Sequence, residues 1–171
     1  YPLRTGFPIP KLEYTPAVSR TPTMPVETRP EPTDAHRKLR EDDQLAGLID
    51  QHGYLVIQPA PDPFRRLVKA IARQQVSMAS AAATWERLTD AFDVTPTEMR
   101  DAEPAALQAV GLSEAKGEYV QAAADAFDAR GWSRKAFAGL SDEAVIEELT
   151  EIRGIGPWTA KMFLQFGLGR E

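Results

Sequence analysis

The sequence contains no cysteine among its 171 residues and only two histidines, His36 and His52. Disulfide bonds and cysteine-ligated zinc or iron–sulfur sites are therefore excluded within these residues. Such a composition is typical of a reducing, intracellular compartment. Neither histidine has a partner at metal-ligand spacing, so we interpret both as solvent-exposed or helix-capping residues.

Long apolar runs are also missing. No stretch reaches the length of about 18 apolar residues that a membrane span requires, and no secretory signal is visible. We therefore expect a cytoplasmic protein without a membrane partner. We also expect a monomer. The chain begins with Tyr1 instead of methionine, so we expect that its natural start is missing.

The sequence lacks an excess of basic residues, and its net charge of −5 argues against a nucleic-acid partner. The distribution of charge weakens that objection. Residues 64–87 hold five basic side chains against one acidic one, and residues 151–171 hold three against two, while many of the acids lie between residues 125 and 148. These segments are either mildly basic binding surfaces or ordinary solvated helix faces.

Proline divides the chain into two parts. Residues 1–33 contain eight of the fourteen prolines, which predicts an extended arm or linker, with a possible edge strand around residues 7–14. From Asp34 onward the periodicity is helical, and no strand alternation follows residue 63. We therefore predict an all-α fold with a proline-rich arm at 1–33 and one helical domain at 34–171.

Several helices can be placed from their caps and apolar stripes. Leu39, Leu45, Leu48 and Ile49 suit one amphipathic helix that stops near Gly53. Asp62 and Pro63 form a helix start, as N-cap and first helical residue. Further helix starts are expected at the serine and threonine caps Ser77, Thr95, Ser113 and Ser141.

Gln74 and Gln75 occupy positions where the apolar stripe of the preceding helix calls for core residues. Such a local conflict is often a sign of function. The alternative is that the two amides cap the helix end or face solvent, and the residues alone leave both interpretations open.

Residues 107–120 and 149–163 each read as a helix, a short glycine-containing hairpin and a second helix. In the later one, Gly154 and Gly156 allow backbone angles and close approaches that a Cβ would forbid. Pro157 stands where a helix has a spare N–H position, so the following free N–H groups point toward one place. This arrangement predicts an anion site built from peptide donors.

The sequence resembles the helix-hairpin-helix DNA glycosylase superfamily, and within it the DNA-3-methyladenine glycosylase II branch. The matching segments are DPFRRLVKAIARQQVS (62–77), LQAVGLSEAKGEYV (107–120) and LTEIRGIGPWTAKMFLQFGLG (149–169). The resemblance covers roughly residues 40–171. It implies two helical lobes with a helix-hairpin-helix motif that binds double-stranded DNA carrying a damaged base.

The resemblance assigns roles to hairpin residues. It implies that the N–H groups of Gly154, Gly156 and Thr159 hold a phosphate of the damaged strand. It further implies that the hairpin carbonyls of Thr150, Ile152 and Ile155 hold a monovalent cation, sodium or potassium, next to that phosphate. No other cofactor is expected.

The same resemblance implies base flipping and a pocket for the flipped base. Gln75 would fill the gap left by the flipped nucleotide, with Gln74 packed behind it. Trp158 would line the base pocket, where its indole face attracts a cationic methylated purine; the alternative is a core tryptophan. Bifunctional relatives carry a nucleophilic lysine in place of Trp158, so a monofunctional enzyme that uses water is expected.

The catalytic aspartate of the family lies in a segment resembling V-x-P-x-x-D, which the resemblance places beyond Glu171. No acid within the chain replaces it by motif; Asp142 and Glu151 read as helix-start and solvent-face residues. We therefore expect an incomplete C-terminus and no turnover by these 171 residues. Two hypotheses remain, a glycosylase for alkylated purines or a non-catalytic DNA-binding module, whereas a protein-interaction bundle leaves the G-I-G-P-W spacing unexplained.

Overall fold

The computed structural model describes residues 34–54 and 57–170, and within these ranges it contains helices and no strands. The predicted all-α fold is confirmed, while the proline-rich arm and its possible edge strand lie outside the described residues. The helices are α1 Asp34–Leu39, α2 Asp43–His52, α3 Pro63–Ala72, α4 Met78–Ala91, α5 Pro96–Asp101, α6 Pro104–Ala109, α7 Glu114–Arg130, α8 Arg134–Ala138, α9 Asp142–Thr150, α10 Pro157–Phe163 and the π-helical segment η2 Leu164–Leu168.

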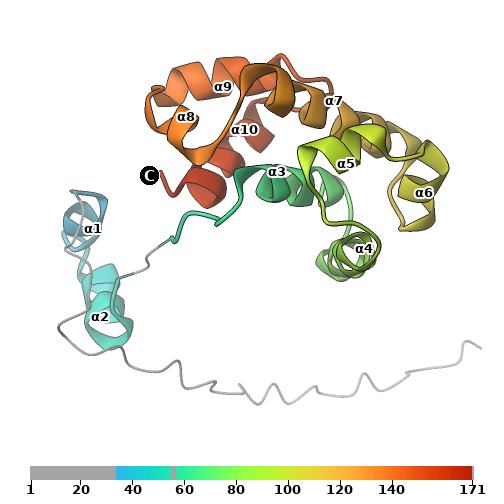
Figure 1. Cartoon of the computed structure of the whole chain (residues 1–171). Coiled ribbons are helices and arrows are strands. Elements are labelled where there is room, and N and C mark those ends of the chain that lie inside the picture. The colour runs from blue at the N-terminus through green and yellow to red at the C-terminus, as the bar shows by residue number, and fades with distance from the viewer. Residues whose placement is uncertain (1–33, 55–56, 171) are drawn as a thin grey trace, which may run out of the picture.

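Helix α3 lies at the centre of the fold (Figure 1). As expected, its N-terminus is capped by Asp62, whose carboxylate accepts a hydrogen bond from the backbone N–H of Arg65 at 3.1 Å. Its apolar side chains Phe64, Leu67, Val68 and Ile71 are all buried. The helix contacts α4, α7, α10 and η2, and therefore fixes the position of the chain that leaves it at Arg73.

Helix α7 is the longest helix of the described chain and a second centre of packing. Helices α5 and α6 pack against α7. Aromatic contacts join the C-terminal end of α7 to α8 and α10, from Phe127 through Phe137 to Phe163. One continuous hydrophobic cluster runs through both groups, from Phe64 to Leu164.

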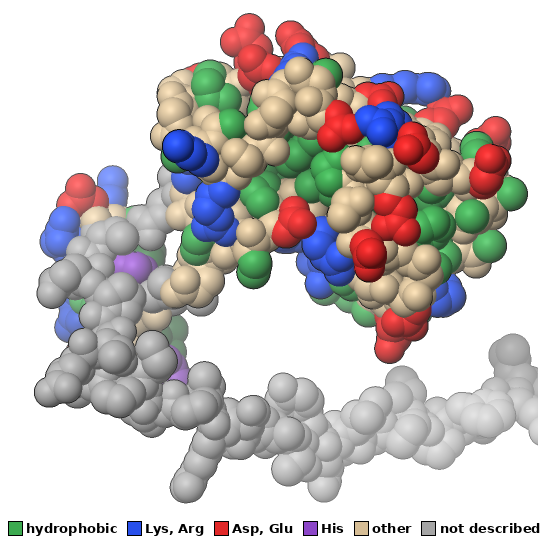
Figure 2. All heavy atoms as spheres, in the orientation of Figure 1, with side chains coloured by type: hydrophobic (Ala, Val, Ile, Leu, Met, Phe, Trp, Pro, Cys, Tyr) green, Lys and Arg blue, Asp and Glu red, His purple; other side chains and the backbone are tan. Residues whose placement is uncertain are grey.

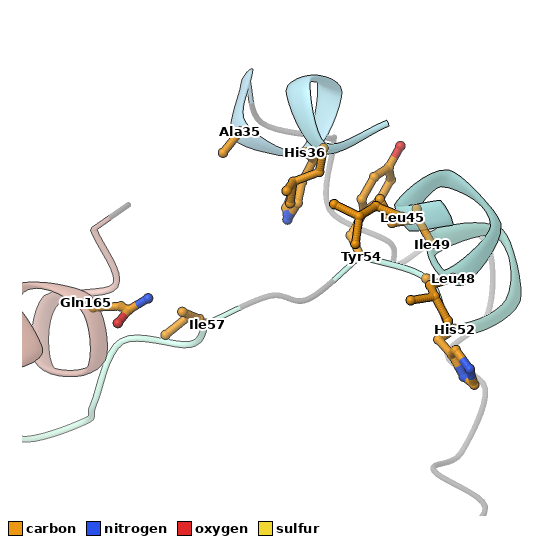
Figure 3. A pocket seen from close by; sticks show the side chains of 11 residues that line it. Ala35, His36, Leu45, Leu48, Ile49, His52, Tyr54, Ile57 and Gln165 are labelled. Atoms are coloured by element: carbon orange, nitrogen blue, oxygen red, sulfur yellow. The ribbon is translucent and has the colours of Figure 1, made fainter. Parts of the chain in front are cut away.

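The prediction of a single amphipathic helix around residues 39–49 is wrong about the number of helices. The segment forms two helices, because Asp42 caps a new one by accepting hydrogen bonds from the N–H groups of Gln44 and Leu45. Helix α2 ends at Gly53 as expected, but its apolar stripe stays exposed, and Leu48 retains 52% of its surface. In Figure 1 these two helices lie apart from the others, and Figure 3 shows their side chains around an open hollow that faces Gln165 of η2.

The interpretation of both histidines as exposed or capping residues is wrong for His36. Its side chain is buried at 7% exposure and lies against the ring of Tyr54, with 4.6 Å between ring centroids. His52 is exposed at the end of α2. No group of His, Asp or Glu residues in the described ranges has a metal-binding arrangement. The helices described here include none long and apolar enough to cross a membrane.

Candidate nucleic-acid interface

The hairpin between α9 and α10 is anchored in the core by its two isoleucines. Ile152 and Ile155 are 6% and 4% exposed. Their backbones make the turn, because the N–H of Ile152 donates to the carbonyl of Leu149 at 3.1 Å and that of Ile155 donates to the carbonyl of Ile152 at 3.0 Å. Burial of these two side chains leaves Gly156 exposed and Gly154 partly exposed.

Gly154 is required by both its backbone angle and its surroundings. Its φ of +84° lies in the left-handed region, which disfavours other residues. A Cβ at this position would lie 2.1 Å from Cγ of Tyr119. The ring of Tyr119 therefore covers the hairpin backbone directly and connects it to α7.

The hairpin leaves a set of peptide donors unused. Within the part of the chain that the structure describes, the N–H groups of Gly154, Gly156 and Thr159 donate to no protein acceptor. Nothing lies within 4 Å of where a Cβ on Gly156 would stand, so another molecule can approach this backbone closely. The Thr159 side chain is buried, which holds the first turn of α10 in place.

The carbonyls predicted to hold a cation differ in their hydrogen bonding. The oxygen of Ile152 accepts the Ile155 N–H. The oxygens of Thr150 and Ile155 accept no hydrogen bond from the described residues. Carbonyl oxygens with free lone pairs suit a hard monovalent cation, so two of the three predicted ligands have lone pairs available for such an ion.

Gln74 and Gln75 leave α3 in a turn beside the hairpin. The Gln74 amide donates to the carbonyl of Gly154 at 3.0 Å and more weakly to Oγ1 of Thr159 at 3.4 Å. Gln75 is exposed and has a φ of +54°, an unusual backbone conformation for a residue other than glycine. The first glutamine is thus tied to the hairpin, and the second is held outward in a strained conformation, as is common at functional sites.

These residues converge on one surface hollow, here called the hairpin hollow. Trp158 contributes to it and retains 67% of its surface, which excludes the alternative of a core tryptophan. Six of the nine residues predicted for the site line the hollow, whereas Thr150, Ile152 and Ile155 are not among its lining residues. The full lining consists of Gln74, Gln75, Ser113, Ala115, Lys116, Tyr119, Gly154, Gly156, Trp158 and Thr159.

The second hairpin, between α6 and α7, leads into the Ser113 cap and the start of α7, which also line the hollow. The N–H of Leu112 closes its turn on the carbonyl of Leu107 at 3.2 Å, and Gly111 adopts a φ of +101°. Arg87 donates from Nε to the carbonyl of Val110 at 3.0 Å. One cation of the basic segment at 64–87 therefore stabilises this hairpin.

Sequence reasoning missed Lys116 and Tyr119, which project from α7 into the hairpin hollow. Their spacing of three residues places both on one helix face, directly after the Ser113 cap. That spacing predicts a shared helix face. It does not say what the face contacts until the structure places both hairpins at the same hollow. Burial lowers the pKa of Lys116, because desolvation disfavours its charged form.

Charge around the hollow is sparse. The hairpin residue Arg153 pairs with Glu118 at 2.9 Å, and no carboxylate is among the lining residues that the structure describes. Asp142 and Glu151 are engaged elsewhere, with Arg170 and Arg130. Figure 2 shows acidic side chains distributed over the helical body, several of them along the edge formed by α9. An anion in the hairpin hollow would therefore meet mainly peptide N–H groups and Lys116.

Comparison with known families identifies one that matches this chain over most of the helical region. The sequence model described as HhH-GPD superfamily base excision DNA repair protein matches residues 68–166. DNA-3-methyladenine glycosylase 1 of Schizosaccharomyces pombe is 35% identical over 115 residues, which are 64% of this chain and 50% of that protein. The chain thus spans about half the length of this relative.

Solved structures of two proteins named as 3-methyladenine glycosylase or glycosidase are similar to this chain. The Schizosaccharomyces pombe 3-methyladenine DNA glycosylase in complex with abasic DNA superposes with a TM-score of 0.65 at 30% identity, over 76% of this chain and 67% of that one. A DNA-3-methyladenine glycosidase from Bacillus halodurans superposes with a TM-score of 0.68 at 30% identity, over 81% of this chain and 65% of that one.

Proposed function

Because this chain belongs to the HhH-GPD superfamily of base excision DNA repair proteins, we propose that it is the DNA-gripping part of a glycosylase for alkylated purines. The reaction is hydrolysis of the N-glycosidic bond of a 3-methyladenine-type base in double-stranded DNA. The observation that carries the proposal is the convergence of hairpin amides, Gln75 and Trp158 on one hollow.

The hairpin holds the damaged strand in this proposal. The unused N–H groups of Gly154, Gly156 and Thr159 donate to phosphate oxygens, and no side chain at Gly156 blocks the approach. A sodium or potassium ion on the carbonyls of Thr150, Ile152 and Ile155 would add positive charge beside that phosphate. Peptide donors carry no net charge, so an acidic chain can bind DNA in this way.

Two exposed side chains act in flipping the damaged nucleotide and in recognising its base. Gln75 enters the space vacated by the nucleotide, while Gln74 keeps the turn attached to the hairpin through its 3.0 Å bond to Gly154. The exposed indole of Trp158 offers a face to the cationic methylated base, an attraction of about 0.5–2 kcal/mol. Having no basic lone pair, Trp158 cannot act as a nucleophile, which supports a monofunctional reaction with water.

A carboxylate is needed to stabilise the developing positive charge on the sugar. None of the described residues lining the hairpin hollow carries one. This observation favours a second candidate function, a DNA-binding module without catalysis. The resemblance places the acid beyond Glu171, and we propose that a protein extended through that segment is the active form.

Two measurements test the proposal. The first is fluorescence anisotropy with a duplex that contains an abasic site, the type of DNA present in the Schizosaccharomyces pombe complex. We expect tighter binding to this duplex than to undamaged DNA, and equal or absent binding contradicts the proposal. The second is release of methylpurine from alkylated DNA, for which we expect no activity from residues 1–171 and activity from the extended protein. If neither protein releases a base although DNA binds, the non-catalytic module is the correct function.

A further inference from the structure

Lys116 links the second hairpin helix to the turn that carries Gln75. Its Nζ donates to the carbonyl oxygen of Ala72 at 2.8 Å. Ala72 is the last residue of α3, where carbonyls lack partners within the helix. The lysine therefore caps α3 just before the chain turns through Gln74 and Gln75.

This bond uses one of the three N–H donors of the ammonium group. The described residues include no carboxylate paired with Lys116, whereas Glu118 on the same helix pairs with Arg153 at 2.9 Å. The side chain is half-buried and lines the hairpin hollow together with Gln75 and Gly156. Two N–H donors of the ammonium therefore remain available on a residue that lines the hollow.

We infer that Lys116 binds a phosphate of the DNA backbone while it holds the end of α3. The inference rests on the proposed function. The ammonium contributes the net positive charge that the peptide donors of Gly154, Gly156 and Thr159 lack, from α7 in the same hollow. One side chain would therefore contact both the DNA backbone and the end of α3, from which the turn carrying Gln75 begins.

The salt dependence of binding measures this contact. Lys116→Met keeps the apolar stem and removes the charge, Lys116→Arg keeps the charge, and Lys135→Met is the control on α8, away from the hollow. Each protein is titrated against the abasic-site duplex over a series of potassium chloride concentrations. Loss of one phosphate contact makes the negative slope of log K against log salt shallower by about 0.9 and lowers the affinity roughly eightfold at about 0.1 M salt. We expect this change for Lys116→Met alone.

The outcomes separate the inference from the proposed function. If the unsubstituted chain does not bind DNA, both the proposed function and the inference on Lys116 are wrong. If it binds and Lys116→Met keeps the same slope, Lys116 only caps α3 and the phosphate contact is wrong.

Amine acetylation of the unsubstituted protein, read by mass spectrometry, serves where Lys116→Met fails to fold. DNA should protect Lys116 and leave Lys135 reactive. Equal modification of Lys116 with and without DNA overturns the inference.

Discussion

Gly154 and Gly156 stand two residues apart in one hairpin, yet only at Gly154 does the fold itself require glycine. At Gly154 the backbone has a positive φ and the Tyr119 ring occupies the space of a side chain. At Gly156 the φ of −95° is ordinary and the space is open. The first glycine serves the fold, and the second leaves room for another molecule.

We expect Gly154→Ala to lower the free energy of unfolding by about 1–3 kcal/mol through backbone strain, and further through the clash with Tyr119. Urea denaturation measures the loss. Gly156→Ala is the matched control and should stay within about 0.5 kcal/mol of the parent. Equal stability of both variants would mean that Tyr119 does not pack on the hairpin.

Gly156→Asp places a negative charge where the proposed phosphate binds. We expect DNA binding to be lost, because the carboxylate repels the phosphate and fills the open approach. The helical circular-dichroism signal should persist, since nothing lies within 4 Å of the new Cβ. Undiminished binding to the abasic duplex would place the phosphate elsewhere on the protein.

At the scale of elements, the turn after α3 carries two adjacent glutamines with different roles. One stabilises the turn, and the other is available for DNA. Gln74 ties the turn to the hairpin, a contact between residues 80 positions apart in sequence. Gln75 is exposed, and its amide makes no hydrogen bond with the residues that the structure describes. The same side-chain type therefore does different work at two consecutive positions.

We expect Gln74→Ala to cost about 0.5–1.5 kcal/mol of stability, the usual net value of a hydrogen bond. Gln75→Ala should change stability by less than about 0.5 kcal/mol and should instead reduce the fluorescence gain of a 2-aminopurine placed opposite the flipping position. Thermal unfolding and fluorescence titration of both variants measure the two effects. The reverse pattern would exchange the roles of the two glutamines.

At the scale of the whole molecule, an acidic protein should bind DNA with a weak dependence on salt. The hairpin contributes neutral donors, Arg153 is paired with Glu118, and Arg87 supports the second hairpin. Few counterions are thus released on binding. We expect a slope of log K against log salt of about −1 to −3, measured by anisotropy. A slope near −6 or steeper would require many Lys and Arg contacts and would contradict capture by peptide donors.

The sequence by itself determined most of the helix starts and both hairpins, because their causes are local. Asp62, Ser77, Ser113 and Ser141 all cap the helices that follow them, as expected. The apolar spacing of α3 correctly predicted its buried face. The glycine, proline and tryptophan of residues 153–158 indicated the hairpin and its family, since a tight turn restricts the residues that can form it.

Only the tertiary structure decided what these elements face. The exposed stripe of α2 went against its periodicity, and the buried His36 against its interpretation as an exposed or capping residue. Burial depends on which surface packs against the helix. The contacts of Tyr119 with Gly154 and of Lys116 with Ala72 join segments far apart in sequence. No local pattern encodes such pairs, since they arise when α3, α7 and α10 pack together around one core and bring both hairpins to the same hollow.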